Sequence, residues 1–203
     1  MKVALVSQRV DVLQERGERR DAIDQRLLDW LAACAFLPVP VPNRAERAAP
    51  LWAGLGPALV VLSGGNDLAA YGGDAPERDA TEKVLLQRAV HERVPVLGIC
   101  RGAQLLMHEL GQPLERVPGH IAARHDLRFD NIDRTVNSYH SWGCRAQNNR
   151  LHVLARSDDR VIEAFCHPNI RLLGVMWHPE REPVFHEHDR VLLEQHLLRS
   201  EAR

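Results

Sequence analysis

The sequence predicts an α/β fold in which helices cover both faces of a mostly parallel central sheet. Three observations lead to this prediction. Short apolar runs alternate with segments of helical period along the first half of the chain. These runs are continuous, which is typical of strands that are buried on both faces. The length of 203 residues suits a single domain, residues 1–203, with a sizeable core.

Strands and helices are expected to alternate as far as residue 110. Helical segments are marked by apolar residues on one face, such as Leu27, Trp30 and Leu31. The expected helices cover residues 21–34, 79–93 and 101–110. The expected strands cover residues 3–7, 58–62 and 94–99, with a proline-rich extended segment at 37–41. Such alternation favours right-handed crossovers and therefore parallel strands.

The second half is richer in strands and closes with a helix. Four strands are expected, at residues 135–139, 152–157, 161–166 and 172–177. Residues 184–199 have the character of a closing helix. Residues 112–134 show weak periodicity and several polar side chains, so we expect a loop there that lies over the site and carries specificity.

Charge and composition exclude several classes of function. The formal net charge is −1, so neither nucleic acid nor a membrane surface is an expected partner. No apolar run approaches the roughly 18–20 residues that span a bilayer, and we expect no signal peptide. The four cysteines form no C-x-x-C pair and are sparse for a disulfide scaffold. We therefore expect a reducing, cytoplasmic location, where a thiolate can act as a nucleophile.

A strand-to-helix turn contains the most informative motif. An apolar strand runs into Gly98, Cys100 follows after one residue, and Gly102 lies at the start of the next helix. This G-x-C-x-G pattern is the cysteine form of a nucleophile elbow, in which small neighbours permit a strained backbone. The helix N-terminus favours a thiolate on Cys100, and the N–H of Arg101 points to where an oxyanion would form. The alternative is a buried structural cysteine at the end of a strand.

A second motif supplies the partners that a nucleophilic cysteine needs. The apolar run that starts at Gly174 ends in His178, Pro179 and Glu180. His178 can take the thiol proton as a general base, and Glu180 can orient the imidazole. Either motif alone is weak evidence, but the two in this order predict a catalytic triad of Cys100, His178 and Glu180.

These motifs resemble the class I, or triad-type, glutamine amidotransferase family, and within it the γ-glutamyl hydrolase branch. The blocks that carry the resemblance are residues 62–68, residues 77–82, the elbow, residues 136–140 and the terminal H-P-E. The resemblance implies a flavodoxin-like fold of the class I glutamine amidotransferase type. It also implies a hydrolase that releases glutamate from a γ-glutamyl conjugate through a thioester on Cys100.

The resemblance implies further roles around the triad. Gly65 would supply a second oxyanion N–H beside that of Arg101, and Gln104 would contact the γ-glutamyl group. Ser138 and His140 would line the same pocket. Each of three positions also has a purely structural alternative: a turn glycine at 65, a surface helix residue at 104 and a satisfied core histidine at 140.

The block of residues 77–82 allows two interpretations that do not exclude each other. In the first, Asp79 caps a helix and Glu82 completes a capping box. In the second, Arg78 and Glu82 face the pocket and help to hold the charged amino and carboxylate groups of the glutamyl moiety.

Two histidine pairs have spacings compatible with a metal ion, His120 with His125 and His186 with His188. A thiol mechanism needs no metal, and no cysteine or aspartate completes either pair as a site. We therefore expect neither a metal nor another cofactor.

The leaving group is the least defined part of the prediction. The compact chain resembles a subgroup that cleaves γ-glutamyl-CDP-amidate during phosphoramidate synthesis for surface polysaccharides such as capsules. The alternatives are a γ-glutamyl-aminobutyrate hydrolase of the polyamine pathway, a glutaminase subunit that feeds ammonia to a synthase, and a degenerate member that only binds. We expect a small-molecule γ-glutamyl substrate and no synthase partner, and a homodimer is an open alternative.

Arginine supplies nearly all of the positive charge, and its guanidinium suits bidentate contacts to phosphate. The candidates are those in or beside expected loops. They are Arg9, Arg16, Arg19, Arg20 and Arg124.

Overall fold

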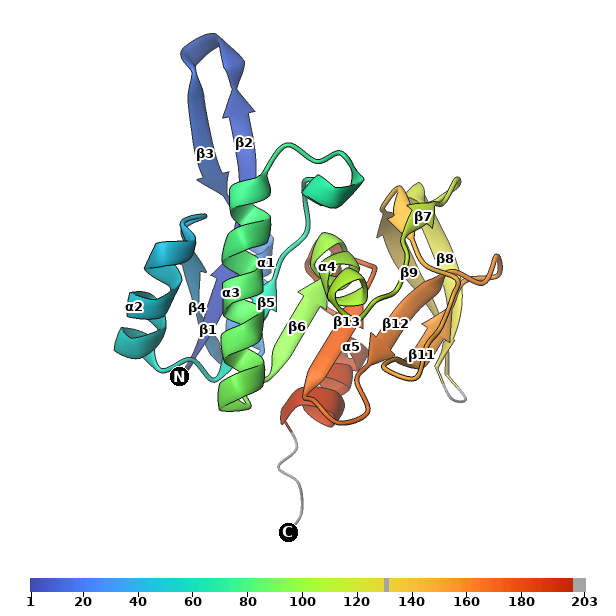
Figure 1. The fold of residues 1–203 in the computed structure, drawn as a ribbon. Coiled ribbons are helices and arrows are strands. Elements are labelled where there is room, and N and C mark those ends of the chain that lie inside the picture. Colours follow the sequence, from blue (N-terminus) through green and yellow to red (C-terminus); the bar gives the residue numbers. More distant parts are fainter. Residues whose placement is uncertain (130–131, 199–203) are drawn as a thin grey trace.

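The computed structural model describes residues 1–129 and 132–198, and a seven-stranded sheet forms its centre (Figure 1). The strand order is β11–β12–β13–β6–β5–β1–β4. Five neighbouring strands run parallel: β4 (Phe36–Val41), β1 (Lys2–Ser7), β5 (Leu59–Leu62), β6 (Val96–Ile99) and β13 (Leu172–Val175). At one edge, β12 (Ile162–Cys166) and β11 (His152–Arg156) continue the sheet with antiparallel pairing. The predicted fold class is confirmed.

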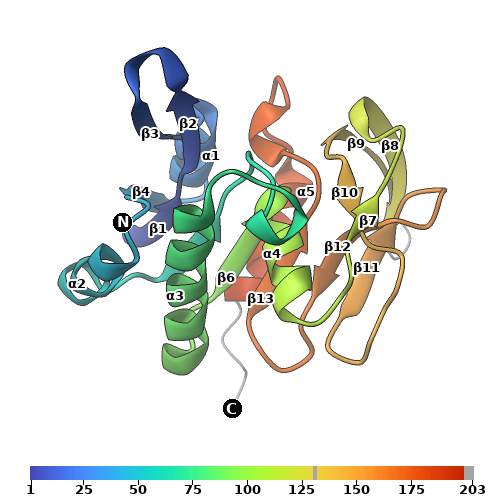
Figure 2. The same cartoon turned by 45° about the horizontal axis from the view of Figure 1, so that its top comes forward.

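Helices cover both faces of this sheet (Figures 1 and 2). One layer consists of α2 (Ala45–Leu55), α3 (Pro76–Glu92) and α4 (Arg101–Glu109), and the other of α1 (Gln25–Ala33) and α5 (Glu187–Leu193). Side chains alternate along each strand, so β5 directs Val60 and Leu62 into the first layer and Leu59 and Val61 into the second. The molecule therefore has one core on each side of the sheet.

The boundaries of α1 differ from the prediction. The helix begins at Gln25 because the side chain of Asp24 accepts a hydrogen bond from the N–H of Arg26 at 3.0 Å. Leu27, Trp30 and Leu31 form its buried stripe, as predicted. Residues 21 and 22, which were expected in the helix, belong instead to a strand.

That strand is part of a hairpin that the sequence analysis did not foresee. β2 (Arg9–Leu13) and β3 (Glu18–Ala22) pair in an antiparallel ribbon that projects from the body of the molecule (Figure 1). Gly17 takes a left-handed conformation, with φ of 63°, next to the turn. The helix α2 was also missed, because Pro50 lies inside it and interrupts the usual helical signal.

The expected loop at residues 112–134 is wrong. Most of this segment forms β7 (Glu115–Arg116), β8 (Ile121–Phe129) and the start of β9 (Ile132–Tyr139), while residues 130–131 lie outside the described part. β8 pairs along its length with β9, and this hairpin packs beside β11 (Figure 2). Most of the β8 side chains are exposed or half-buried, so the segment lacked the apolar pattern of a core strand.

The C-terminal helix begins later than predicted. α5 starts at Glu187 and continues as a π-helical turn over Glu194–Leu198. Arg199, the predicted last residue of this helix, lies outside the described residues. Within the described part of the chain, no helix combines the length and apolarity needed to cross a bilayer.

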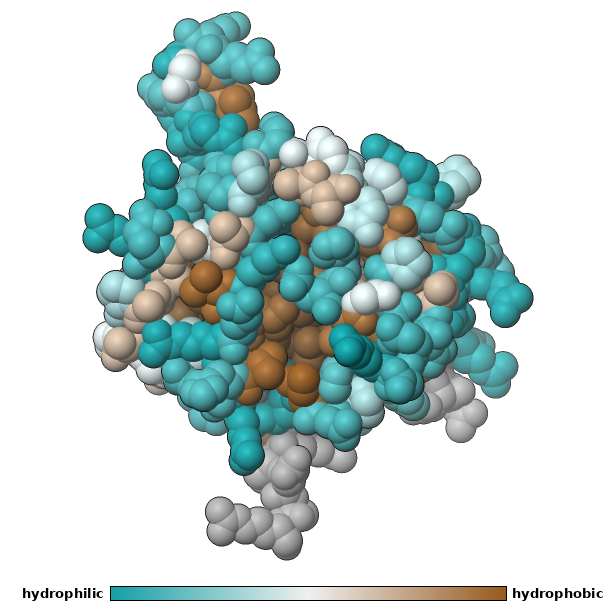
Figure 3. Space-filling model, viewed as in Figure 1, coloured by the Kyte–Doolittle hydropathy of each residue, from teal (hydrophilic) through white to brown (hydrophobic). Residues whose placement is uncertain are grey.

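The surface is mostly polar with one apolar hollow in the view of Figure 3. The hollow, about 320 Å³ in volume, lies between α3 and α4. Its apolar lining comes from Leu86, Val90, Leu106, Leu110, Ile170 and Leu172.

Candidate active site

The predicted site residues gather where the parallel strands end. Ser7 ends β1, Ser63 follows β5, Cys100 follows β6, and His178 comes shortly after β13. These four strands are neighbours in the sheet, so their carboxyl ends lie along one edge. In open α/β sheets this edge is the usual position of a ligand site.

The backbone of Cys100 has the strain expected of a nucleophile elbow. Its φ is +51° and its ψ is −105°, a backbone conformation that residues other than glycine rarely adopt. Close packing explains the flanking glycines: a Cβ on Gly102 would lie 2.0 Å from the Leu62 carbonyl oxygen, and one on Gly98 would lie 2.8 Å from the Ala103 nitrogen. The turn is therefore compressed between β5, β6 and α4, and Cys100 stands at the N-terminus of α4.

His178 lies between Cys100 and Glu180. Its Nδ1 is 2.6 Å from Glu180 Oε1, and because a carboxylate only accepts, Nδ1 carries the hydrogen. Nε2 is then the nitrogen available to the Cys100 sulfur. Burial opposes a charge on His178, but the Cys100 charge and hydrogen bond, together with Glu180, outweigh burial and raise its pKa to about 9. This arrangement favours a protonated His178 imidazole beside Cys100.

Asn137, in β9, forms two hydrogen bonds with the backbone of His178. No sequence motif indicated this role. Its Nδ2 donates to the His178 carbonyl oxygen at 2.8 Å, and its Oδ1 accepts from the His178 N–H at 2.9 Å. Nδ2 also reaches Glu182 Oε1 at 2.8 Å. Residues 136–140 form one of the blocks that carry the family resemblance, but only the fold brings the Asn137 amide onto the turn that contains His178.

Arg26, in α1, donates hydrogen bonds to two carbonyl groups just after His178. Its Nε donates to the Glu180 carbonyl oxygen at 2.8 Å, and its Nη2 donates to the carbonyl oxygen of Glu182. These partners lie 154 and 156 residues away along the chain, so local sequence patterns hold no signal for them.

Arg78 and Glu82 are placed differently from the pocket-facing interpretation. Both side chains are completely buried, and Arg78 Nε bonds Glu82 Oε1 at 3.0 Å. The guanidinium donates to three successive carbonyl oxygens, those of Ser63, Gly64 and Gly65. The two residues therefore lie beneath the Ser63–Gly65 turn and support it.

This support orients the predicted oxyanion donor. The C=O and N–H of one trans peptide point in opposite directions. Since the Gly64 carbonyl points to Arg78, the N–H of Gly65 points away from Arg78. A Cβ on Gly64 would lie 2.6 Å from His178 Cε1, so the turn passes directly against the His178 imidazole. Gly65 has φ of +85°, which explains the need for glycine.

The capping-box interpretation of Asp79 and Glu82 is wrong. α3 begins three residues earlier than predicted, with Ala75 as N-cap and Pro76 in its first turn. Asp79 instead accepts from the Ala69 N–H at 2.9 Å and forms an ion pair with the buried side chain of Arg101. Arg101 also pairs with Glu82, so these charges join the elbow to α3.

The remaining predicted pocket residues are all buried. Gln104 is only 4% exposed, which rules out a surface helix position, and its Nε2 donates to the Trp142 carbonyl oxygen at 3.0 Å. Ser138 donates to the His120 carbonyl oxygen at 2.7 Å. His140 Nδ1 lies 3.0 Å from the same Trp142 oxygen. Gln104 and His140 therefore meet on one carbonyl group.

A cleft of about 310 Å³ opens onto this site. One wall comes from the base of the β2–β3 hairpin and the start of α1. The other comes from the turn at residues 63–65 and the turn at residues 178–181. It is lined by Arg9, Asp11, Ala22, Ile23, Asp24, Leu27, Ser63, Gly64, Gly65, His178, Glu180 and Arg181.

Of the arginines predicted to contact phosphate, only Arg9 lines this cleft. It forms an ion pair with Asp11 at 2.8 Å and is about half exposed. The others lie elsewhere: Arg19 binds Glu77, Arg20 binds Glu18, and Arg124 binds Glu182, while Arg16 lies at the end of the hairpin.

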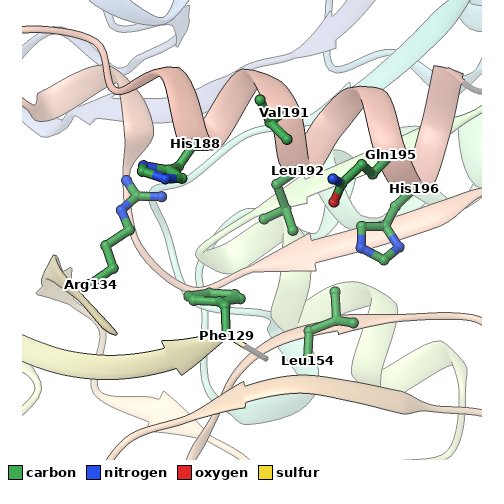
Figure 4. A pocket seen from close by; sticks show the side chains of 8 residues that line it. All are labelled: Phe129, Arg134, Leu154, His188, Val191, Leu192, Gln195 and His196. Atoms are coloured by element: carbon green, nitrogen blue, oxygen red, sulfur yellow. The ribbon is translucent and has the colours of Figure 1, made fainter. Parts of the chain in front are cut away.

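A second hollow, of about 170 Å³, lies between α5 and the strands β9 and β11 (Figure 4). None of its lining residues was predicted to bind substrate. They are Phe129, Arg134, Leu154, His188, Val191, Leu192, Gln195 and His196. Of the predicted triad, His178 and Glu180 line the cleft described above, and no triad residue lines this hollow.

Fold and site together define an α/β protein with a cysteine at a strained nucleophile elbow and a histidine–carboxylate pair beside it. The class I glutamine amidotransferase family matches residues 20–199, and the chain belongs to that family.

Relatives within this family include hydrolases. γ-Glutamyl-CDP-amidate hydrolase of Campylobacter jejuni is 37% identical over 61% of this chain and 62% of its own length. The chain thus spans less than two thirds of that relative. γ-Glutamyl-γ-aminobutyrate hydrolase of Escherichia coli (strain K12) is 26% identical, over 88% of this chain and 86% of its own. A solved glutamine amidotransferase from Thermotoga maritima shares the fold, with a TM-score of 0.65 and 17% identity over 88% of this chain and 76% of its own.

Proposed function

We propose that this protein is a cysteine-dependent amidohydrolase that releases glutamate from a γ-glutamyl conjugate through a thioester on Cys100. The observation that carries this proposal is the pairing of an elbow cysteine with a buried His178 whose pKa is raised to about 9. Such a pair holds a thiolate ready to attack and a proton ready to be given to a leaving group.

In the first half-reaction, the Cys100 thiolate attacks the γ-carbonyl carbon and a C–S bond forms. The carbonyl oxygen becomes an oxyanion, for which the N–H groups of Gly65 and Arg101 are the proposed donors. The Arg101 N–H is the first of α4 and has no acceptor within the helix. As the tetrahedral adduct collapses, the C–N bond breaks and His178 gives its proton to the departing nitrogen.

In the second half-reaction, the now neutral His178 takes a proton from water while the oxygen of that water attacks the thioester carbon. Collapse of this adduct breaks the C–S bond and releases glutamate. The thiolate and the imidazolium are restored. Glu180 holds Nδ1 throughout, so that Nε2 faces the reacting atoms.

For the leaving group, we propose a nucleotide phosphoramidate such as γ-glutamyl-CDP-amidate. In such a compound the phosphorus is bonded directly to the scissile nitrogen, so anionic oxygens lie next to the reacting bond. Arg9 supports this proposal because its side chain packs against Gly65, at 3.2 Å from where a Cβ would be. Its guanidinium therefore lies beside the proposed oxyanion donor, in the same cleft.

The substrate proposal predicts a clear order of specificity constants. We expect kcat/KM for γ-glutamyl-CDP-amidate to exceed that for γ-glutamyl-aminobutyrate and for glutamine by at least about tenfold, measured on the purified chain alone. KM for the phosphoramidate should also rise with salt. A higher kcat/KM for the aminobutyrate conjugate would replace this substrate. Glutamine hydrolysis that appears only with a synthase partner would indicate a glutaminase subunit.

Arg9→Gln tests the phosphate contact itself. It should raise KM for the phosphoramidate by about tenfold, the effect of losing one charged hydrogen bond, and leave KM for glutamine unchanged. Arg16→Gln, at the far end of the same hairpin, is the matched control and should change neither value. Equal effects of Arg9→Gln on both substrates would argue against a phosphate contact.

Arg78 gives a separate prediction as a positioning residue. Arg78→Lys keeps the charge but not the fork that holds three carbonyl groups, so the Gly65 N–H should lose its orientation. We expect kcat to fall by about 10²-fold, as for the loss of one oxyanion donor, with little change in KM. Arg19→Lys, an exposed ion-pair residue nearby, is the control. A rise in KM at unchanged kcat would show instead that Arg78 serves substrate binding.

A further inference from the structure

Three polar side chains, two of them buried and one half-buried, converge between the β8–β9 hairpin and the central sheet. His120 precedes β8, His125 lies within β8, and Glu163 lies in β12 of the central sheet. Each offers one ligand atom, and these atoms all lie within 4.8 Å of one another. The local motif around His120 and His125 contains no third ligand, because Glu163 is far away along the chain and only the fold brings it close.

The atoms that face one another have unused bonding capacity. Among residues 1–129 and 132–198, no hydrogen-bond partner is found for His120 Nδ1, for His125 Nε2, or for either carboxylate oxygen of Glu163. His120 Nδ1 lies 3.2 Å from Glu163 Oε1, an ion-pair distance with poor hydrogen-bond alignment. Glu163 is completely buried. A buried carboxylate without hydrogen bonds is costly unless a cation neutralises it.

His140 strengthens this argument. Its Nδ1 faces the Trp142 carbonyl oxygen, which can only accept, so Nδ1 carries a hydrogen and a ring with a single hydrogen has only a lone pair on Nε2. The lone pair of Nε2 then faces Glu163 Oε1 at 3.5 Å. A lone pair opposite a carboxylate is repulsive unless a proton or a metal ion lies between them. His120, His125 and His140 thus present nitrogen atoms to the carboxylate of Glu163.

The surroundings of His120 match those of a metal ligand. Its other ring nitrogen, Nε2, lies 3.3 Å from both carboxylate oxygens of Asp159. Asp159 is itself fixed by Ser157 at 2.7 Å and by Arg145 at 2.6 Å. Histidines that bind a metal usually donate their second N–H to a carboxylate in this way, which fixes the tautomer and the ring orientation.

We propose that His120, His125 and Glu163 form a binding site for a divalent transition-metal ion, and Zn²⁺ in particular. Two imidazoles and one carboxylate are a ligand set typical of zinc, whereas Mg²⁺ and Ca²⁺ prefer oxygen ligands. The ligand atoms must approach by about 1 Å to reach zinc bond lengths near 2.1 Å, which rotation of the half-buried His125 side chain can supply.

The proposed ion has a structural role in the active site. It joins β8 to β12, and β8 pairs with β9, which carries Asn137. Asn137 holds the backbone of His178 through two hydrogen bonds. The ion would therefore fix the hairpin that positions the catalytic imidazole, and it takes no part in the thiol chemistry.

Without metal, a proton holds part of the cluster together. Burial opposes a charge on His120, but Glu163 and Asp159 outweigh it and raise its pKa, whereas burial lowers the pKa of His125. The other predicted histidine pair is arranged differently. His186 is exposed near Glu182, and His188 lines the hollow beside α5.

The test uses the full chain with Cys100→Ala, because a thiolate beside a histidine would itself bind Zn²⁺. After treatment with a chelator and desalting, we expect one Zn²⁺ per chain by titration calorimetry and by elemental analysis. Melting temperature should rise by roughly 5–10 °C at about a hundredfold excess of Zn²⁺ over Kd. Co²⁺ should give the visible absorption of a tetrahedral site.

His125→Gln should weaken Zn²⁺ binding by about 10²-fold or more and abolish the shift in melting temperature. His125 is only half-buried, so this variant should fold even if Glu163→Gln does not. His152→Gln, an exposed histidine in β11, is the matched control and should bind as the parent does. Failure of the parent to bind Zn²⁺, or equal binding by the His125→Gln variant, would overturn the proposal. Neither result depends on the substrate of the Cys100 site.

Discussion

Replacing Cys100 by alanine is expected to abolish glutamate release, with a loss on the order of 10⁴-fold or more in kcat, while the fold survives. The loss follows because no other group can form the acyl intermediate. The fold should survive because alanine fits the same space and the strain of the elbow is held by its neighbours, with Cys100 N donating to the Val175 carbonyl oxygen at 2.8 Å. Circular dichroism and melting temperature would check the fold.

The same experiment has a direct chemical counterpart. With substrate under rapid quench, the elbow peptide of the parent protein should carry a γ-glutamyl thioester on Cys100, detected as a mass increase that hydroxylamine removes. The Cys100→Ala protein should show none. Retention of even about a tenth of the activity by Cys100→Ala would refute the central proposal.

The other three cysteines serve as matched controls. Burial raises the pKa of Cys34 to about 11, and burial also raises the pKa of Cys144 and of Cys166. These thiols are therefore protonated at neutral pH and poor nucleophiles. Cys166→Ala should keep full activity, because the residue lies half-buried in β12, away from the elbow.

The strands of the core were predictable because their physics is local. A strand buried on both faces must be apolar throughout. β5 and β6 meet that condition over four residues each, and β1 is apolar from Val3 to Val6. The elbow was predictable for a similar reason, since close contacts require glycine at 98 and 102. Both signals are contained in short stretches of sequence.

The two hairpins were not predictable in this way. β3 buries none of its residues, and β8 buries only one. Their strands are held by pairing with a neighbour, so the side chains are free to be charged and leave no apolar period. Yet the β2–β3 hairpin contributes Arg9 and Asp11 to the cleft. Asn137, in β9, binds the backbone of His178.

The roles of buried charges also depend on the whole fold. One of the two interpretations placed Arg78 in the pocket, and an arginine is rarely buried completely. Its burial is possible because three carbonyl groups and Glu82 saturate the guanidinium. Glu163 gave no sequence signal at all, since its neighbours His120 and His140 reach it from other strands and turns.

The second large effect concerns His178. Its replacement by alanine should reduce kcat/KM by about 10²–10⁴-fold, because His178 moves a proton in both half-reactions. Glu180→Gln should cost far less, since Glu180 only orients and stabilises the ring. His152→Ala and Glu187→Gln, both exposed, are the controls for a histidine and a carboxylate. Small and equal losses for the two site variants would place the base elsewhere, with His140 the next candidate.

The pH dependence separates the two roles of this pair. The pKa of His178 is raised from 6.5 to about 9, so its imidazolium is retained through neutral pH and lost as pH rises through about 9. Since acylation needs that proton for the leaving nitrogen, kcat/KM should fall above about pH 9. The stabilisation that this charge contributes to the fold is complete below about pH 6.5 and is lost progressively as pH rises from about 6.5 through about 9.

Glu180→Gln removes a negative charge 2.6 Å from Nδ1, so the imidazolium should lose its proton at a lower pH. The alkaline limb of kcat/KM should therefore move toward neutrality, while Glu187→Gln leaves it in place. A profile of Glu180→Gln with an unmoved alkaline limb would mean that this limb does not report His178. The thiolate–imidazolium pair would then not be the form of the enzyme that attacks the γ-carbonyl group.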